Sequence, residues 1–216
     1  MLKIAKVGYR YKNSDIDVLK GLDVEFKAGE FSVILGPSGS GKSTLLSLMA
    51  GLDRPVLGHI EIDGENLANM HLADYRRERI SMIFQAFHLF PLLTAAENAA
   101  YAMQQNGVGR HEALKQAGVF LESVGISKEK HSRYPSNLSG GEQQRVAIAR
   151  CLASGAKVIL ADEPTGNLDT ANGDLVVKIL KNLAHEEGYC VVVVTHNLDI
   201  ANEADAVFKM SDGRFL

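Results

Sequence analysis

The 216-residue sequence predicts an α/β fold built on a parallel sheet, with an N-terminal antiparallel β subdomain and an inserted α-helical subdomain. Two continuous apolar runs, Val158–Ala161 and Val191–Val194, are typical of strands buried on both faces of a parallel sheet. The helical pattern over residues 171–186 lies between them as the crossover that two parallel strands require. A third apolar run, Phe31–Leu35, leads into a glycine-rich turn and then into helical spacing.

Short alternating segments predict the antiparallel subdomain. The apolar positions over residues 4–7 and 22–26 alternate with polar ones and are separated by polar turns. Gly58–Gly64 is a similar segment that closes with Asp-Gly, a turn signal between strands. We therefore expect a small sheet made from these three segments.

Helical patterns replace strand patterns between residues 94 and 150. Breaks at Asn106-Gly107, Gly125 and Pro135 divide this region into three predicted helices over residues 94–105, 110–124 and 139–153. These helices predict a helical subdomain over residues 85–154. Residues 1–84 and 155–216 then form the core with its β subdomain, and the length fits one domain of this kind.

Composition excludes several classes of protein. The chain has 23 Lys plus Arg against 26 Asp plus Glu, a net charge of −3, so no nucleic-acid partner is expected. No apolar run approaches the roughly 18 residues of a membrane-spanning helix, and the first six residues are too charged for a signal peptide. Cys151 and Cys190 lie in apolar patterns without metal-ligand spacing, which indicates core residues in a reducing cytoplasm.

The turn after Phe31–Leu35 carries the most specific motif. Gly36-Pro37-Ser38-Gly39-Ser40-Gly41-Lys42-Ser43-Thr44 matches G-x-x-x-x-G-K-[ST] at every fixed position. Its glycines let backbone N–H groups point at phosphate oxygens beside the positive end of the next helix. Lys42 is then placed to reach the β- and γ-phosphates, and Ser43 to ligate Mg²⁺. An ordinary glycine-rich turn is the alternative, but the flanking strand and helix favour a P-loop NTPase core that binds a nucleotide.

Polar residues follow both buried strands. Asp162-Glu163 closes the first, where Asp162 can hold Mg²⁺ and Glu163 can accept a proton from the attacking water. A polar turn before Pro164 is the alternative interpretation. His196 follows the second strand, where an imidazole can donate a hydrogen bond to the γ-phosphate and align the water, although a lone histidine is more often a surface residue.

A second glycine pair lies in Leu-Ser-Gly-Gly-Glu-Gln-Gln-Arg, residues 138–145. Ser139 and Glu142 form a capping box for the helix that follows, but this does not explain Gly140 and Gly141, which each cost about 1 kcal/mol relative to alanine in a helix. Bare N–H groups at a helix start bind anions, so the segment is a candidate second phosphate binder. One γ-phosphate does not need two cradles from one chain. We therefore predict a head-to-tail homodimer with two shared nucleotide sites.

Three further positions are candidates for nucleotide contacts. Tyr9 and Tyr11 lie between the first short strands, and each is either a core residue at the rim or a platform for an adenine ring. Gln85 follows the predicted strand 80–84 at its carboxyl end, where open α/β sheets place ligands.

Leu-Ser-Gly-Gly between a P-loop and an Asp-Glu strand end resembles the signature of ATP-binding cassette (ABC) ATPases, and the resemblance covers about residues 3–214. It implies that Tyr11 stacks on adenine and that Gln85 touches Mg²⁺ and senses a membrane partner. It implies that Ser139, Gly140, Gly141 and Glu142 face the other protomer's nucleotide. It also implies that Asp162 and Glu163 are the metal-holding and water-activating pair, that Leu168-Asp169 lies at the dimer seam and that His196 is the switch histidine.

Finer matches resemble the branch that contains lipoprotein-release, macrolide-export and cell-division ATPases. They are Gly51–Pro55, Leu93–Asn98, Gly141–Arg145 and Asp162–Asp169. The resemblance implies a motor subunit in the cytoplasm, held on the inner face of the cell membrane through a separate or fused permease that selects the cargo. Glu142 stands where the family usually has glutamine. A carboxylate there would repel a partner's γ-phosphate unless helix capping holds it away.

Apolar residues follow Gln85 without helical or strand periodicity: Phe87, Phe90, Leu92 and Leu93. They are either core of the helical subdomain or a groove for a cytoplasmic helix of the permease, and we predict docking near Gln85–Leu93. A rival function is a soluble ABC protein acting on ribosomes or DNA, which the single cassette and the absent basic face disfavour. A scaffold that binds ATP but hardly hydrolyses it is disfavoured by Glu163 and His196.

Overall fold

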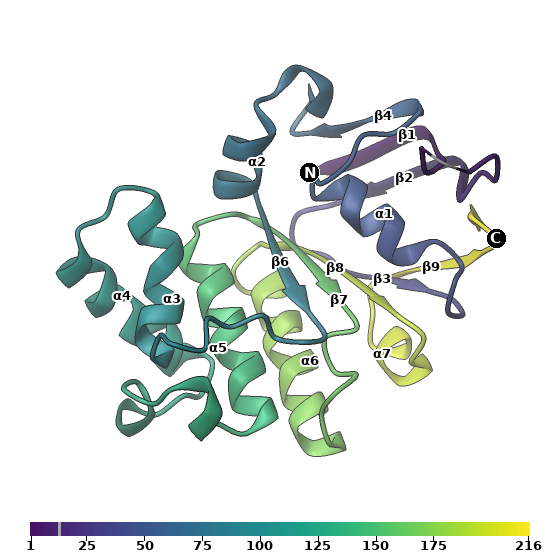
Figure 1. Cartoon of the computed structure of the whole chain (residues 1–216). Coiled ribbons are helices and arrows are strands. Elements are labelled where there is room, and N and C mark those ends of the chain that lie inside the picture. The colour runs from purple at the N-terminus through teal and green to yellow at the C-terminus, as the bar shows by residue number, and fades with distance from the viewer. Residues whose placement is uncertain (13) are drawn as a thin grey trace.

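The computed structural model describes residues 1–12 and 14–216, which form two sheets and the helices packed against them (Figure 1). The larger sheet has the order β10-β9-β3-β8-β7-β6, and the five strands from β9 to β6 in this order all run parallel. Its strands are β3 (Phe31–Leu35), β6 (Ile80–Phe84), β7 (Val158–Asp162), β8 (Cys190–Thr195), β9 (Ala206–Ser211) and β10 (Arg214–Phe215). The predicted parallel sheet is therefore confirmed.

Helix α6 (Thr170–His185) joins β7 to β8, as the apolar pattern predicts. Every residue of β3 and β8 is buried, which explains why these strands read as continuous apolar runs. The parallel strands end at one edge, and the loops that follow β3, β6, β7 and β8 therefore meet there.

The smaller sheet is antiparallel, as predicted, with the order β2-β1-β4-β5. Its strands are β1 (Leu2–Tyr9), β2 (Leu19–Phe26), β4 (Leu57–Ile62) and β5 (Glu65–Asn66). Helix α1 (Lys42–Met49) lies between the two sheets (Figure 1), where Leu45 and Met49 share a core with Ile4 of the small sheet and Val192 of the large one.

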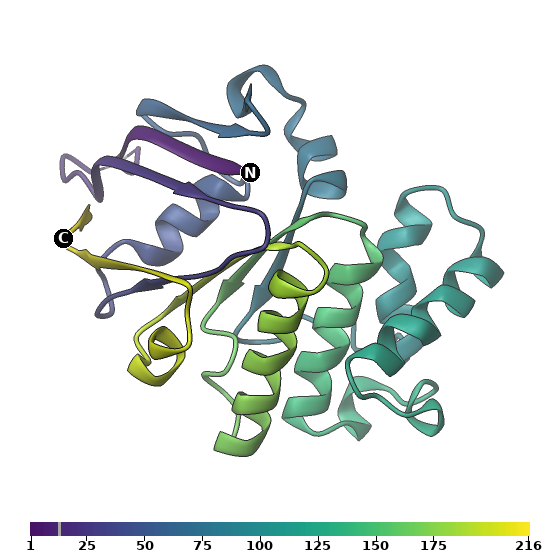
Figure 2. The same cartoon turned by 180° about the vertical axis from the view of Figure 1, so that it is seen from behind.

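Three helices occupy the region where helical patterns dominate: α3 (Ala95–Gln105), α4 (Arg110–Ser123) and α5 (Gly140–Ala153). Figure 2 shows α5 and α6 side by side on one face of the large sheet, with α3 and α4 beyond α5. Ile148 and Leu152 of α5 share one core with Ile83 and Ile159 of the sheet. Helix α5 therefore packs on the sheet as well as on α3 and α4, and the boundaries at residues 85 and 154 stay a prediction.

Several short elements lie outside the sequence expectations. They are α2 (Leu72–Glu78), α7 (Leu198–Asn202), β9, β10 and the 3₁₀ turns Leu67–Asn69, Lys128–Lys130 and Pro135–Asn137. Helix α2 buries only Tyr75, so it carries no apolar stripe for periodicity to reveal. In the described part of the chain, no helix combines the length and the hydrophobicity needed to cross a membrane.

Candidate functional site

The glycine-rich loop between β3 and α1 takes a conformation that few other residues permit. Gly39 and Gly41 have φ values of 82° and 102°, in the left-handed region. A Cβ at position 36 would lie 2.2 Å from the carbonyl oxygen of Met210 on β9, so the backbone of Gly36 passes too close to that strand for a side chain. The motif's glycines are therefore required by local geometry.

Lys42 points back into this loop. Its side chain is 7% exposed, and Nζ donates hydrogen bonds to the carbonyl oxygens of Gly36 at 2.8 Å and Pro37 at 2.9 Å. Its ammonium group is thus held inside the turn that a phosphate group would enter. The next residue, Ser43, donates a hydrogen bond from Oγ to Oδ1 of Asp162 at 3.3 Å, which links α1 to the end of β7.

One cavity of about 640 Å³ collects most of the predicted site residues. The residues that line it come from distant parts of the sequence: Tyr11, Val18, Ser38, Gly39, Gly41, Lys42, Ser43, Thr44, Gln85, Asp162, Glu163 and His196. Gly36, Pro37 and Ser40 of the loop are not among the residues that line it. Val18 is the lining residue that the sequence analysis missed, and no signal in its surroundings marks it.

Glu163 and His196 form one hydrogen-bonded unit at the edge of the sheet. The Glu163 carboxylate accepts hydrogen bonds from Oγ1 of Thr195 at 2.8 Å and from the backbone N–H of His196 at 3.1 Å. The Nδ1 atom of His196 lies 2.7 Å from Oε1 of Glu163. Glu163 has a φ of 45°, an unusual conformation for a glutamate, and its three hydrogen bonds hold the side chain in place.

The electrostatics around Asp162 suit a cation. Burial raises the pKa of Asp162 above its ordinary value, the hydrogen bond from Ser43 opposes this effect, and the charge of Glu163 adds to it. A divalent cation would relieve both the burial cost and the repulsion between neighbouring carboxylates. Hydroxyl, carboxylate and amide oxygens are the ligands Mg²⁺ prefers, so Ser43, Asp162 and Gln85 fit this ion.

The structure distinguishes the two tyrosines. Tyr9 belongs to β1 rather than to the turn after it; it is buried, and its hydroxyl donates a hydrogen bond to Asp53, which raises the pKa of Tyr9 to about 12. Tyr11 is 52% exposed and lines the cavity, with its hydroxyl 3.0 Å from Oγ1 of Thr44. The two rings meet edge to face at 5.1 Å. Tyr9 is therefore a core residue, whereas the side chain of Tyr11 is accessible at the cavity.

Ser139–Glu142 lies at the start of α5 and is not among the described residues that line the cavity. The predicted capping box is present: Ser139 Oγ accepts from the N–H of Glu142 at 3.3 Å, and Glu142 accepts from the N–H of Ser139 at 2.9 Å. Glu142 also pairs with Lys130. The hydrogen bond from Lys130 is the main cause that lowers the pKa of Glu142.

The sequence suggests that Gly140 and Gly141 are both glycine because they bind an anion. The packing of α5 gives a different reason for one of them. A Cβ at position 141 would lie 2.2 Å from Oδ1 and 2.8 Å from Cβ of Asn172 on α6, so the close contact of α5 with α6 requires glycine there. A Cβ at position 140 would lie at an ordinary 3.6 Å from Cζ of Phe87. Gly141 thus has a structural reason within one chain, and only Gly140 stays without one.

The segment after Gln85 is divided between core and surface. Leu89 packs against the main core, whereas Phe90 is 40% and Leu92 86% exposed. Phe90 and Leu92 are therefore not core residues of the helical subdomain, and the docking of a permease helix here stays a prediction. The Phe90 ring lies beside Tyr101 of α3 and under the guanidinium of Arg150 of α5.

A strand, a glycine loop and a helix that hold a buried lysine beside an Asp-Glu strand end define a P-loop NTPase. The chain belongs to the ABC transporter family, whose model matches residues 19–166. Together with the fold, this match confirms the predicted ABC-type ATP-binding and ATP-hydrolysing subunit.

Similar proteins indicate the branch of the family to which the chain belongs. A lipoprotein-releasing system ATP-binding protein, LolD 2 of Rhodopirellula baltica, is 43% identical over 214 residues, covering 95% of this chain and 84% of that protein. The macrolide export ATP-binding/permease protein MacB of Wolinella succinogenes is 44% identical over 202 residues, covering 92% of this chain but only 31% of that longer protein. The predicted family branch is thereby confirmed, and the non-transport alternative finds no support.

A solved structure shows the same architecture. The dimeric ATP-binding cassette MJ0796, in a post-hydrolysis state bound to ADP and Pi, superposes with a TM-score of 0.90 at 38% identity, covering all of this chain and 96% of that one. The predicted fold class is confirmed by this agreement.

Proposed function

We propose that the chain is the motor subunit of an export or lipoprotein-release system, in which two copies close on two Mg-ATP, hydrolyse them and reopen while a permease does the transport. One observation carries this proposal: a single cavity collects the P-loop, Asp162, Glu163, Gln85 and His196, whereas the capped glycine segment at the start of α5 lies outside it. The start of α5 could bind an anion but does not line its own chain's cavity, so we infer that it binds the nucleotide of a second copy.

The residues of the cavity divide the chemistry among them. Lys42 and the N–H groups of the loop stabilise negative charge on the transferred phosphoryl group, a contribution that preorganised donors make without reorganisation. Ser43, Asp162 and Gln85 would hold Mg²⁺, which neutralises charge on the β- and γ-phosphates. Glu163 accepts a proton from the attacking water. His196, already bound to the Glu163 carboxylate, keeps that side chain oriented and aligns the water.

The start of α5 is proposed to complete the partner's site. Ser139, Gly140, Gly141 and Glu142 begin a helix of 14 residues, so their end of the helix carries a partial positive charge. Glu142 is held by Ser139 and Lys130, which keeps its carboxylate from adding full repulsion toward a partner's phosphate. The dimeric state of the solved cassette bound to ADP and Pi supports this arrangement.

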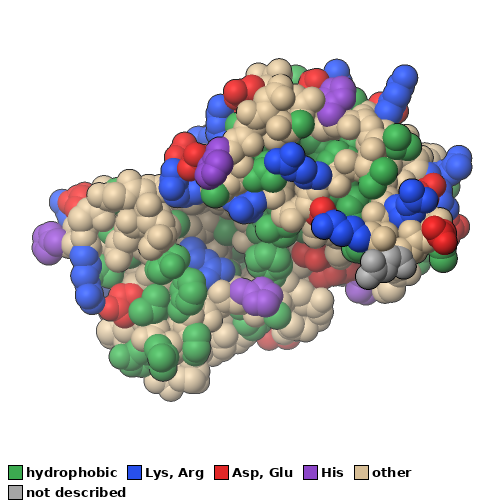
Figure 3. All heavy atoms as spheres, turned by 45° about the horizontal axis from the view of Figure 1, so that its top comes forward, with side chains coloured by type: hydrophobic (Ala, Val, Ile, Leu, Met, Phe, Trp, Pro, Cys, Tyr) green, Lys and Arg blue, Asp and Glu red, His purple; other side chains and the backbone are tan. Residues whose placement is uncertain are grey.

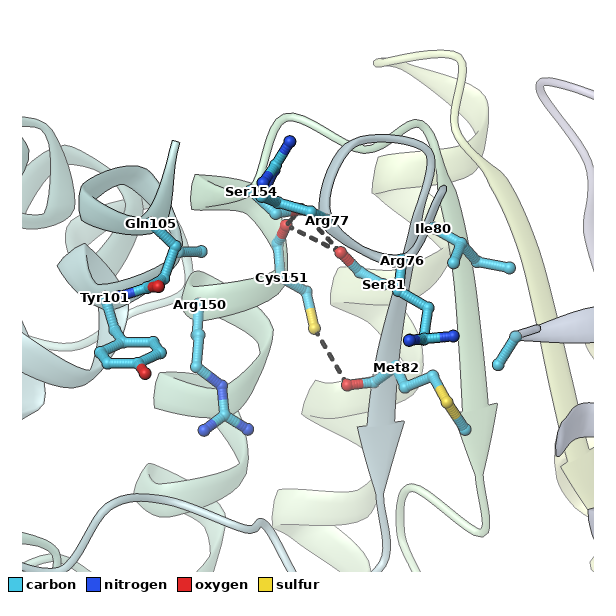
Figure 4. A pocket seen from close by; sticks show the side chains of 12 residues that line it. Arg76, Arg77, Ile80, Ser81, Met82, Tyr101, Gln105, Arg150, Cys151 and Ser154 are labelled. Atoms are coloured by element: carbon cyan, nitrogen blue, oxygen red, sulfur yellow. Dashed lines mark hydrogen bonds between the residues drawn. The ribbon is translucent and has the colours of Figure 1, made fainter. Parts of the chain in front are cut away.

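The permease is proposed to dock near Gln85–Leu93 and the adjoining hollow of about 330 Å³ between α2, β6, α3 and α5, whose lining residues Tyr101 and Arg150 contact the Phe90 ring. Figure 3 shows this face hollowed between the helical part and the rest of the molecule, with Lys and Arg side chains beside the hollow. In Figure 4, Tyr101 and Arg150 lie on one side of it and Arg76 and Met82 on the other. An apolar wall with three arginines, Arg76, Arg77 and Arg150, suits a cytoplasmic helix that carries apolar and acidic residues.

The ATP-dependent oligomeric state of Glu163→Gln tests the shared site. Glutamine can still accept the hydrogen bond from Thr195 but cannot take a proton from water, so ATP should bind and persist. Light scattering should show a monomer that becomes a dimer only with Mg-ATP. The control Glu187→Gln, on an exposed position after α6, should hydrolyse ATP like the wild type. A Glu163→Gln protein that binds ATP and stays monomeric, also with Glu142→Gln added, contradicts the shared site.

The docking surface is tested by Phe90→Ser with Leu92→Ser. Both side chains are exposed, so the variant should fold normally yet lose the membrane protein that co-purifies with the tagged wild-type chain. Val119→Ser, at an apolar position of α4 that is 66% exposed, is the matched control and should retain it. Retained co-purification by the double variant removes the docking assignment.

A further inference from the structure

Two segments far apart in the sequence exchange hydrogen bonds beside the nucleotide cavity. Gln85 directly follows β6, and Asn167 lies in the turn between β7 and α6. Nδ2 of Asn167 donates to the backbone carbonyl oxygen of Gln85 at 2.9 Å, and Nε2 of Gln85 donates to Oδ1 of Asn167 at 3.2 Å. The side chain of Asn167 therefore binds both the backbone and the side chain of Gln85.

This exchange gives each amide a single orientation. A backbone carbonyl oxygen only accepts hydrogen bonds, so it must face the NH₂ end of Asn167. The oxygen end of Asn167 then faces Gln85, and it can be satisfied only by the NH₂ end of that side chain. A flipped Gln85 amide would set two acceptor oxygens against each other. The carbonyl oxygen of the Gln85 side chain is thus the end left available at the cavity that Gln85 lines.

Gly166 makes room for this arrangement. A Cβ at position 166 would lie 2.8 Å from Nε2, 3.1 Å from Cδ and 3.3 Å from Cγ of Gln85. Gly166 has no left-handed backbone that would call for glycine, since it is not among the positive-φ residues of the described chain. Glycine at this position is therefore explained by the side chain that lies across it.

We propose that Asn167 is a positioning residue that presents the oxygen end of the Gln85 amide to the nucleotide-bound metal. This rests on the proposed function, in which Gln85 contributes to the Mg²⁺ site. Asn167 also adjoins Leu168-Asp169 and the start of α5, because a Cβ at Gly140 would lie 3.8 Å from the Asn167 carbonyl oxygen and 3.7 Å from Cδ2 of Leu168. Asn167 thus links the segment proposed to dock the permease to the segment proposed to meet the second copy.

Activity measurements give the first test. Asn167→Ala leaves the Gln85 amide free to turn, so the Mg²⁺ concentration for half-maximal ATPase activity should rise by about tenfold, the usual effect of losing a group that orients a metal ligand. Asn167→Asp keeps the acceptor oxygen for Nε2 but loses the donor to the Gln85 carbonyl oxygen, so its effect should lie between those of the wild type and Asn167→Ala. Gly166→Ala displaces the Gln85 side chain and should match Asn167→Ala. In Gln85→Ala, the further change Asn167→Ala should have no added effect.

Two matched controls separate this role from general damage. Asn182→Ala changes an exposed asparagine of α6. Gly109→Ala changes a glycine with a φ of −59°, where an added Cβ would meet nothing within 4 Å. Both should keep the wild-type Mg²⁺ dependence.

The side-chain NH₂ resonances of Gln85 in the nucleotide-free protein give a readout that needs no turnover. They are assigned by their absence in Gln85→Ala. They should shift and exchange faster with water in Asn167→Ala, whereas exchange with water should stay slower in Asn167→Asp, which keeps the acceptor for Nε2.

The two readouts separate the two proposals. If the wild type does not hydrolyse ATP even with its permease, the proposed function fails, and the resonances still decide whether Asn167 orients Gln85. If the wild type is active and Asn167→Ala changes neither the resonances nor the Mg²⁺ dependence, the role of Asn167 is overturned and the proposed function stands. Shifted resonances with an unchanged Mg²⁺ dependence also overturn that role.

Discussion

Two helices of this chain, α1 and α5, have glycines at their N-termini, and these two N-termini are capped differently. Within the described residues, no side chain caps the start of α1, whose N-cap is Gly41. The start of α5 is closed by the capping box of Ser139 and Glu142. The first N–H groups of a helix lack partners inside it. Those of α1 are therefore left for a ligand, whereas two donors at α5 are already bound by its own side chains.

Charge separates the two helix starts further. Lys42 opens α1, and no acidic residue lies in its first turn. Helix α5 carries Glu142 in its first turn, neutralised by Lys130. The loop before α1 thus combines an uncapped helix start with the ammonium group of Lys42 within one chain. The start of α5 is already capped in the single chain, so only the N–H groups outside the capping box are available to a ligand. We expect this of a surface that binds the nucleotide of a second copy.

Lys42→Ala is the largest test of this contrast. Removing the ammonium group should lower ATPase activity by at least about 100-fold, because a preorganised charge next to the transferred group is lost. Binding of a fluorescent ATP analogue should weaken as well. Lys178→Ala, at an exposed position of α6, is the control and should match the wild type. If Lys42→Ala retains most of its activity, the start of α1 is not the anion site.

The contrast between the two helix starts is only partly readable from the sequence. Strands β3 and β6 match their predicted bounds, since both are apolar runs with polar residues or glycine on either side. The P-loop, Asp162-Glu163 and His196 could be placed together because parallel strands end at the same edge of a sheet. The capping box was predictable because it depends on residues only three positions apart.

Contacts between distant segments could not be predicted in this way. The clash that requires Gly141 depends on Asn172 of another helix, and the orientation of Gln85 depends on Asn167, 82 positions away. Val18, the residue before β2, lines the cavity although its neighbours in the sequence do not indicate this. Such contacts are set by how elements pack, which local periodicity does not encode.

Alanine substitutions at the two glycines of α5 test the comparison of the helix starts through a smaller effect, a change in the free energy of unfolding. Gly141→Ala should lower the free energy of unfolding by about 2 kcal/mol, because the added Cβ overpacks the contact with Asn172. Gly140→Ala should instead raise it by up to about 1 kcal/mol, since ordinary contact distances are available and alanine favours a helix over glycine. In the Glu163→Gln protein, however, Gly140→Ala should weaken the ATP-driven dimer, because its methyl group stands where the partner's phosphate would approach.

Urea unfolding and light scattering measure these two properties separately. Equal losses of stability for the two alanine variants would contradict the packing role of Gly141. An unchanged dimer in the Gly140→Ala protein would show that bare backbone at this position has no part in the shared site.

The smallest effect concerns the charge at the start of α5. Glu142→Gln keeps an oxygen that accepts from the Ser139 N–H but loses the charge-assisted bond to Lys130, so the free energy of unfolding at pH 7 should fall by about 1 kcal/mol. The carboxyl's pKa lies below its ordinary value of 4.5 in the folded chain. Its stabilising effect is therefore fully present above that ordinary value and is lost as the pH falls through the lower, folded-state pKa.

Urea unfolding at pH 7 and at progressively lower pH checks this prediction. The difference between the wild type and Glu142→Gln should be constant near neutral pH and shrink in acid, and it should be small at any pH once Lys130→Met is present in both proteins. A difference that does not depend on pH would mean that the carboxylate stabilises α5 only as a cap. The charge would then be free to act on a partner's phosphate, and the start of α5 would repel the nucleotide that the shared site requires it to bind.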